Sequence, residues 1–132
     1  MNHYHDHTAG LPLDDTAGGS DPMLLRRLIG AAYAGCAPCQ VTALTAVSEH
    51  PPTSARVVEV TCTTLVNALG SIPGSALSTL STPFRTLATV GDESGIEAMR
   101  DAAVVMTPAQ RRQAVDSALD LLVGILFGPP GR

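Results

Sequence analysis

Residues 107–128 read TPAQRRQAVDSALDLLVGILFG and contain the strongest helix signal in the chain. Thr107 and Gln110 have the spacing of a capping box, with a proline between them at the first helical position. Apolar residues then recur at helical spacing, and Asp120 is the only charged residue within 119–127. We therefore expect a last helix that is buried on several sides.

A helix of this kind needs either a central position in the fold or a subunit interface. We predict self-association as a homodimer through this helix, with the contact made by Leu119, Leu122, Val123, Leu126 and Phe127. The leading functional hypothesis is therefore a small helical protein that acts by homo-oligomerisation or by binding a protein partner, rather than an enzyme.

Helix signals of the same type occur upstream. A polar cap and a proline at Asp21-Pro22 begin the first helix, which ends near Gly35. The second helix covers about 37–49 and is stopped by Pro51-Pro52, and a third continues from there to Gly70. Each carries apolar residues at the spacing that places them on one helical face.

The middle of the chain is less regular. Two short helical pieces are expected within 71–90, broken near Thr82-Pro83, and a fifth helix follows Asp92, whose carboxylate can cap it. No β-hairpin signal accompanies them, so the predicted fold class is all-α, a compact bundle or orthogonal array of about five to six helices. The predicted organisation is a flexible His/Asp/Gly-rich tail, one helical domain and a short C-terminal tail, over residues 1–20, 21–128 and 129–132.

Composition excludes several classes of protein. The 132 residues carry a net charge of −4, and their eight arginines are scattered, which argues against a nucleic-acid surface. No cationic segment followed by an apolar one is visible at the N-terminus, and the longest apolar stretch, 121–127, is far too short to span a bilayer. We expect a cytoplasmic protein that neither enters a membrane nor, lacking a glycine-rich phosphate loop, binds a cofactor.

The clearest chemical feature is Cys36-Ala-Pro-Cys39, a CxxC pair at the start of the second helix. Two thiols at this spacing can close a disulfide, attack one or bind a soft metal. Unpaired backbone N–H groups and the helix dipole favour a thiolate at Cys36, the candidate nucleophile. Three cysteines in a reducing compartment argue against a permanent disulfide framework.

Cys62 is the third candidate thiol. If the second and third helices form an antiparallel pair about Pro51-Pro52, Cys62 lies level with Cys39, so a Cys39–Cys62 disulfide competes with the one inside the CxxC. The same arrangement leaves His50 roughly 16 Å from Cys39, too far to complete a zinc site. The alternative for all three cysteines is a structural role as small buried hydrophobes.

The CxxC segment resembles, over about fifteen residues, the carboxymuconolactone-decarboxylase-like family of helical thiol enzymes, which carry CxxC at a helix start. The resemblance implies a thiol–disulfide oxidoreductase or peroxide-linked reductase, the alternative function. That family has a histidine four residues after the second cysteine, where this chain has Ala43. No glutamate occurs in the preceding helix either, so the resemblance does not carry peroxidase activity over.

The remaining candidate ligands are His3, His5 and His7 in the N-terminal tail. Neutral imidazoles bind Ni²⁺, Cu²⁺ or Zn²⁺, which makes a metal-responsive helical protein the third hypothesis. A solvated tail is the simpler interpretation, because an unstructured ligand set must lose chain entropy before it binds.

Overall fold

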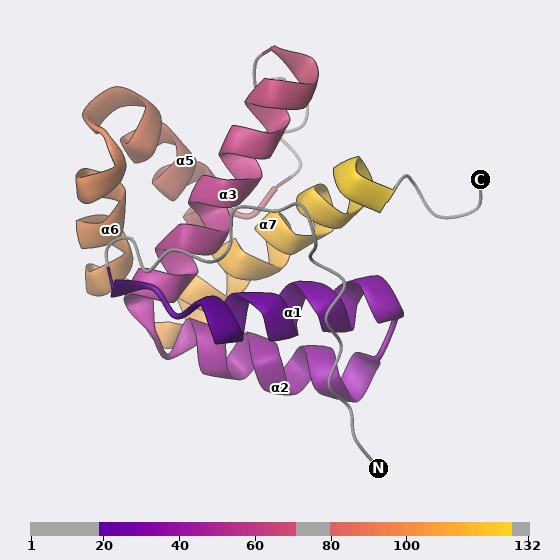
Figure 1. Cartoon of the computed structure of the whole chain (residues 1–132). Coiled ribbons are helices and arrows are strands. Elements are labelled where there is room, and N and C mark those ends of the chain that lie inside the picture. The colour runs from indigo at the N-terminus through magenta and orange to yellow at the C-terminus, as the bar shows by residue number, and fades with distance from the viewer. Residues whose placement is uncertain (1–18, 71–79, 128–132) are drawn as a thin grey trace.

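The computed structural model describes residues 19–70 and 80–127, which form six packed α-helices without a strand in those ranges (Figure 1). The all-α prediction is confirmed. The predicted tail within 1–18, most of the first short helical piece expected after Ser71, and the C-terminal tail lie outside the described residues. The helices are α1 (Pro22–Ala34), α2 (Ala37–Ser48), α3 (Pro51–Leu69), α5 (Thr82–Ser94), α6 (Ile96–Val105) and α7 (Pro108–Phe127).

Helices α1 and α2 form an antiparallel hairpin with a two-residue turn (Figure 1). The Asp21 carboxylate caps α1 as predicted, because it accepts a hydrogen bond from the N–H of Met23 at 2.9 Å. At the other end Gly35 adopts the left-handed conformation, with φ 71°. Its N–H donates to the Ala32 carbonyl, and the N–H of Cys36 donates to the Ala31 carbonyl at 3.1 Å, so the turn is a Schellman motif.

Helix α3 diverges from α2 instead of folding back along it (Figure 1). It packs chiefly on α7 and α6, whereas α2 packs on α1 and α7, so the expected antiparallel pair of the second and third helices is wrong. Glu49 and His50, which join the two helices, both have negative φ, so this connection lacks the left-handed residue that reverses the chain at Gly35. The Ser54 hydroxyl also donates to the Val47 carbonyl at 2.7 Å, which fixes the start of α3 across the end of α2.

Helix α7 is the centre of the fold and contacts α1, α2, α3 and α5. Its capping box is confirmed: the N–H of Thr107 donates to Gln110 Oε1 at 2.9 Å, and the N–H of Gln110 donates to Thr107 Oγ1 at 3.1 Å. In the C-terminal half of α7, where the sequence predicts burial on several sides, Leu119 and Leu122 are buried, Asp120 is exposed, and the side chains of 124–127 lie outside the described part of the chain. Neither α7 nor any other helix in the described ranges has the length and apolar character needed to cross a membrane.

The apolar face of α7 is covered within the monomer. Leu119 and Leu122 are 1% and 0% exposed, so these two residues are not available to the predicted homodimer contact. Val123 is half-buried against the same core, and the side chains of Leu126 and Phe127 lie outside the described part of the chain. The largest fully buried side chains that α7 shares this core with are Leu25, Leu28, Ile29, Val47, Val57, Val58, Phe84 and Leu87.

Arg111 of α7 joins the ends of two other helices and is only 6% exposed. Its Nε donates to the Ser48 carbonyl at 2.7 Å, at the C-terminus of α2. Its Nη1 donates to the carbonyls of Ala103, at 3.0 Å, and Met106, at the C-terminus of α6. A buried cation is thus compensated by carbonyl oxygens at the negative ends of two helices.

The boundary between α5 and α6 differs from the prediction. Helix α5 continues through Asp92 to Ser94, and the break is made by Gly95, with φ 93°. Asp92 therefore lies in the last turn of α5, and the expectation that it caps the following helix is wrong. Gly91 stays helical and permits close packing, since a Cβ there would lie 2.3 Å from the Met99 Cε of α6.

Candidate functional site

The CxxC pair lies at the tip of the α1–α2 hairpin. Cys36 is the N-cap residue of α2 and Cys39 is the third residue of its first turn, as the sequence predicted. The N–H of Cys36 is held by the Schellman motif of α1, and its carbonyl accepts from the N–H of Gln40 at 2.9 Å. Cys36 is therefore fixed from both helices, while the neighbouring Ala37 and Pro38 are exposed.

The two thiols are close enough to react with each other. Cys36 Sγ and Cys39 Sγ lie 2.8 Å apart in hydrogen-bond contact, and both side chains are half-buried. A disulfide requires about 2.05 Å between its sulfur atoms, so closure needs a shift of less than about 1 Å. The first turn of α2 alone sets this separation, because both residues belong to it.

Electrostatics distinguish the two thiols. The hydrogen-bonded contact with Cys36 raises the pKa of Cys39, and desolvation and the charge of a Cys36 thiolate raise it further. A pair of this kind releases its two protons in separate steps. Cys36 is the N-cap residue of α2 and lies at the positive end of the helix dipole, although its side chain makes no capping hydrogen bond. The raised pKa means that Cys39 holds its proton more strongly than an ordinary thiol.

The described segment that carries the pair is uncharged. The sequence contains no charged residue from Leu28 to Ser48, and the exposed side chains near the thiols include Tyr33 and Val41, which are 47% and 53% exposed. Ala43, at the position where the resembled family has its histidine, is buried. His50 lies at the opposite end of α2, where its Nδ1 is 2.6 Å from Thr53 Oγ1. Among the described residues the site is thus a dithiol without a neighbouring histidine.

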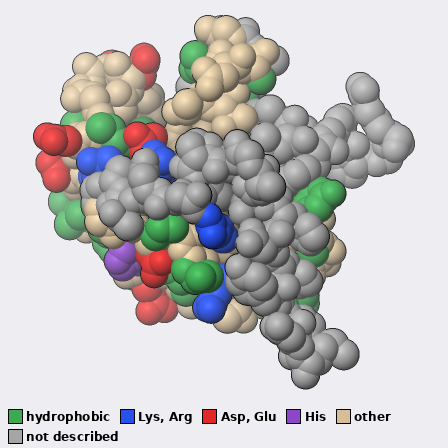
Figure 2. Space-filling view, viewed as in Figure 1, with side chains coloured by type: hydrophobic (Ala, Val, Ile, Leu, Met, Phe, Trp, Pro, Cys, Tyr) green, Lys and Arg blue, Asp and Glu red, His purple; other side chains and the backbone are tan. Residues whose placement is uncertain are grey.

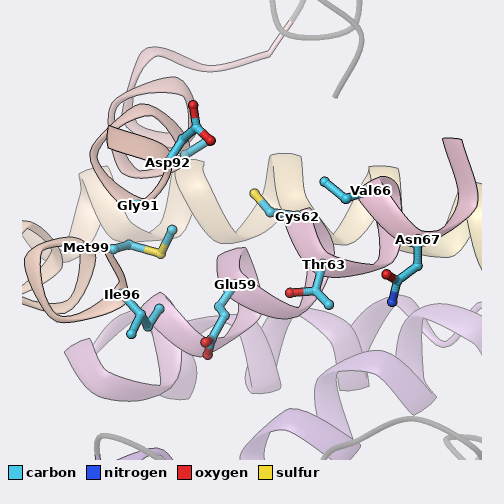
Figure 3. A pocket seen from close by; sticks show the side chains of 10 residues that line it. Glu59, Cys62, Thr63, Val66, Asn67, Gly91, Asp92, Ile96 and Met99 are labelled. Atoms are coloured by element: carbon cyan, nitrogen blue, oxygen red, sulfur yellow. The ribbon is translucent and has the colours of Figure 1, made fainter. Parts of the chain in front are cut away.

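Cys62 lies away from this pair, in a groove of about 340 Å³ between α3, α5 and α6 (Figure 3). No residue of α2 lines the groove, so the expected grouping of the three thiols is wrong, and with it the argument that a Cys39–Cys62 disulfide is geometrically allowed. The physical reason is the divergence of α3 from α2. The lining residues are Glu59, Cys62, Thr63, Val66, Asn67, Ala88, Gly91, Asp92, Ile96 and Met99.

The environment of Cys62 suppresses its ionisation. Burial, followed by the charges of Asp92 and Glu59, raises the pKa of this thiol to about 11. Glu59 is itself paired with Arg56, whose Nη1 lies 2.5 Å from Glu59 Oε1. Cys62 is therefore protonated at neutral pH and poorly suited to be a nucleophile or a resolving thiol.

The structure offers no metal centre in residues 19–70 and 80–127, since no three His, Cys, Asp or Glu side chains there could hold one ion. The predicted ligands His3, His5 and His7 lie outside the described residues.

The groove could not be predicted from the sequence, because its walls come from three helices and no local signal specifies how these helices pack together. Gly91 was the one available sign, as a glycine inside a helix often marks close approach of a neighbour. Comparison of the chain with known protein families, with characterised proteins and with solved structures finds no match.

Proposed function

We propose that this protein is a small thiol–disulfide exchange protein whose working group is the Cys36–Cys39 couple. The observation that carries the proposal is the 2.8 Å separation of the Cys36 and Cys39 sulfur atoms at the tip of the α1–α2 hairpin. Burial of Leu119 and Leu122 also removes part of the surface on which the competing hypothesis of self-association was based.

The reaction consists of two successive thiol–disulfide exchanges. The Cys36 thiolate attacks one sulfur of a substrate disulfide, forms a mixed disulfide and releases the other substrate sulfur as a thiolate. Cys39 then loses its proton to solvent and attacks Cys36 Sγ, which forms the Cys36–Cys39 disulfide and releases the second substrate thiolate. The substrate is reduced by two electrons and the couple is oxidised by two. Cys62 takes no part.

The test is redox equilibration of the full chain in dithiothreitol buffers of graded potential, followed by acid trapping, alkylation and mass spectrometry. The native chain and Cys62→Ser should form one intramolecular disulfide with a single midpoint potential, and Cys36→Ser and Cys39→Ser should form none. Cys39→Ser should accumulate a mixed disulfide at Cys36 when given a small aromatic disulfide. Failure of the native chain to oxidise at any potential, or a requirement for Cys62, would exclude the proposal.

Self-association remains a second candidate, favoured by an exposed apolar pair at the end of α6. Val104 and Val105 are 59% and 83% exposed, a costly arrangement for a surface that contacts only water. Native mass spectrometry and sedimentation of the chain and of a Val104→Thr/Val105→Thr variant provide the measurement. A concentration-dependent dimer that the variant weakens would support this function, and a monomer at high concentration would eliminate it.

A further inference from the structure

The groove between α3, α5 and α6 has the size and lining of a small-molecule site. Its volume of about 340 Å³ falls within the range of ligand pockets, which begins near 300 Å³. Val66, Ile96 and Met99 supply apolar surface, one from α3 and two from α6. In the view of Figure 3, Cys62 and Met99 lie between Asp92 on one side and Glu59 on the other.

The charge of the groove has one sign. None of its described lining residues is basic, whereas Asp92 and Glu59 are acidic. Glu59 is balanced by Arg56, but Asp92 has no ion-pair partner in the described ranges. Helices α5 and α6 together carry Asp92, Glu93, Glu97 and Asp101 against Arg85 and Arg100, and acidic side chains are prominent on this side of the molecule in Figure 2.

The position of Asp92 on its helix adds to this negative potential. It lies in the last turn of α5, at the negative end of the helix dipole, and that turn contains no basic residue. A carboxylate is unfavourable at a helix C-terminus, where a cation would be favourable. A side chain that opposes its own helix dipole beside an apolar cavity is the kind of local conflict that function often explains.

We propose that this groove binds a small organic cation with an apolar body, of the alkylammonium class. The ammonium lies at the C-terminal end of α5 beside Asp92, and the hydrocarbon chain lies against Val66, Ile96 and Met99. A bare metal ion is a poor fit, because the described residues offer no set of three ligands for one. The site is independent of the Cys36–Cys39 couple.

The experiment compares three probes of equal chain length and different charge: hexylammonium, hexanol and hexanoate. Each is titrated into the full ¹⁵N-labelled chain, and amide shifts report affinity and location. We expect shifts on α3, α5 and α6, with hexylammonium binding about threefold to tenfold more tightly than hexanol and hexanoate binding least. Asp92→Asn should reduce the preference for hexylammonium over hexanol to below twofold, while Asp116→Asn, an exposed acid on α7, should keep it.

Alkylation of Cys62 provides a second measurement on the unmutated chain. Saturating hexylammonium should slow the labelling of Cys62 by iodoacetamide, read by peptide mass spectrometry, and leave labelling of Cys36 unchanged. Equal affinity for hexylammonium and hexanoate, shifts that map away from the groove, or an undiminished preference in Asp92→Asn would each overturn the proposal. Absence of any hexylammonium binding would overturn it as well.

Discussion

Replacement of the buried Arg111 by alanine should be among the most destabilising single substitutions in the chain. The side chain is 6% exposed and donates three hydrogen bonds to carbonyls of α2, α6 and the α6–α7 turn. Hydrogen bonds to charged groups contribute about 1.5–3 kcal/mol each to stability. Against this, ordering the arginine side chain on folding costs about 2 kcal/mol of rotamer entropy, a cost that alanine does not have. The carbonyls left behind are partly re-solvated. We expect a net loss of about 3–5 kcal/mol from the free energy of unfolding.

The assay is urea unfolding followed by far-UV circular dichroism, with the slope m fitted for each variant. For m of about 1–3 kcal/mol/M, the expected loss lowers the midpoint by about 1 M or more. Arg111→Lys should recover about half of the loss, since it keeps the charge but cannot span carbonyls of both helix ends.

Arg112→Ala is the matched control. This neighbouring arginine is half-buried and donates one bond, from Nη1 to Thr45 Oγ1 at 2.9 Å, so its removal should cost less than about 1 kcal/mol. If Arg111→Ala costs no more than Arg112→Ala, the buried cation does not stabilise the two helix ends and the reasoning fails.

Three other predictions concern single positions. The pKa of Cys62 is raised from 9.0 to about 11, so the unfolded chain loses this proton at a lower pH than the folded chain does. The contribution of the protonated thiol to stability is therefore full below pH 9 and is lost as the pH rises to 11. The native chain should therefore lose roughly 2 kcal/mol more than Cys62→Ala between these pH values, and parallel curves would show that the thiol is not shielded. Gly91→Ala should destabilise the native chain, because the new Cβ meets Met99 Cε. In a Met99→Ala background the same change should stabilise the fold by up to about 1 kcal/mol, since alanine has the higher helix propensity. An effect of the same sign in both backgrounds would refute the contact. Thr107→Ala should cost about 1 kcal/mol in thermal or urea unfolding and Thr107→Ser almost nothing, whereas equal losses would mean that the hydroxyl does not cap α7.

Features set by neighbouring residues could be predicted from the sequence. The Asp21 cap, the Gly35 terminus and the capping box at Thr107 each involve groups within a few residues of one another, and all are present. The position of the CxxC at a helix start has the same origin. The separation of its two sulfur atoms follows from one helical turn, so this candidate site could be predicted from local sequence alone.

Features set by packing could not be predicted in this way. Pro51-Pro52 shows where α2 must end but carries no information on the direction of α3, so Cys62 was placed beside the wrong helix. An apolar helix such as α7 has the same pattern whether its own monomer or a second copy covers it. Asp92 looks like a cap because a glycine precedes it, yet the chain breaks at the next glycine, Gly95, since Gly91 is needed against Met99.

The central position of α7 has a consequence for biosynthesis. This helix follows α1, α2, α3 and α5 in the chain and yet contacts all four, so the parts of their inward faces that pack on α7 have no cover until it has been made. A nascent chain that stops before Thr107 therefore exposes Leu25, Leu28 and Phe84 to solvent and to other chains. Completion of the core must wait for a helix that begins 74 positions after the end of α1, so the growing polypeptide carries uncovered apolar surface until then.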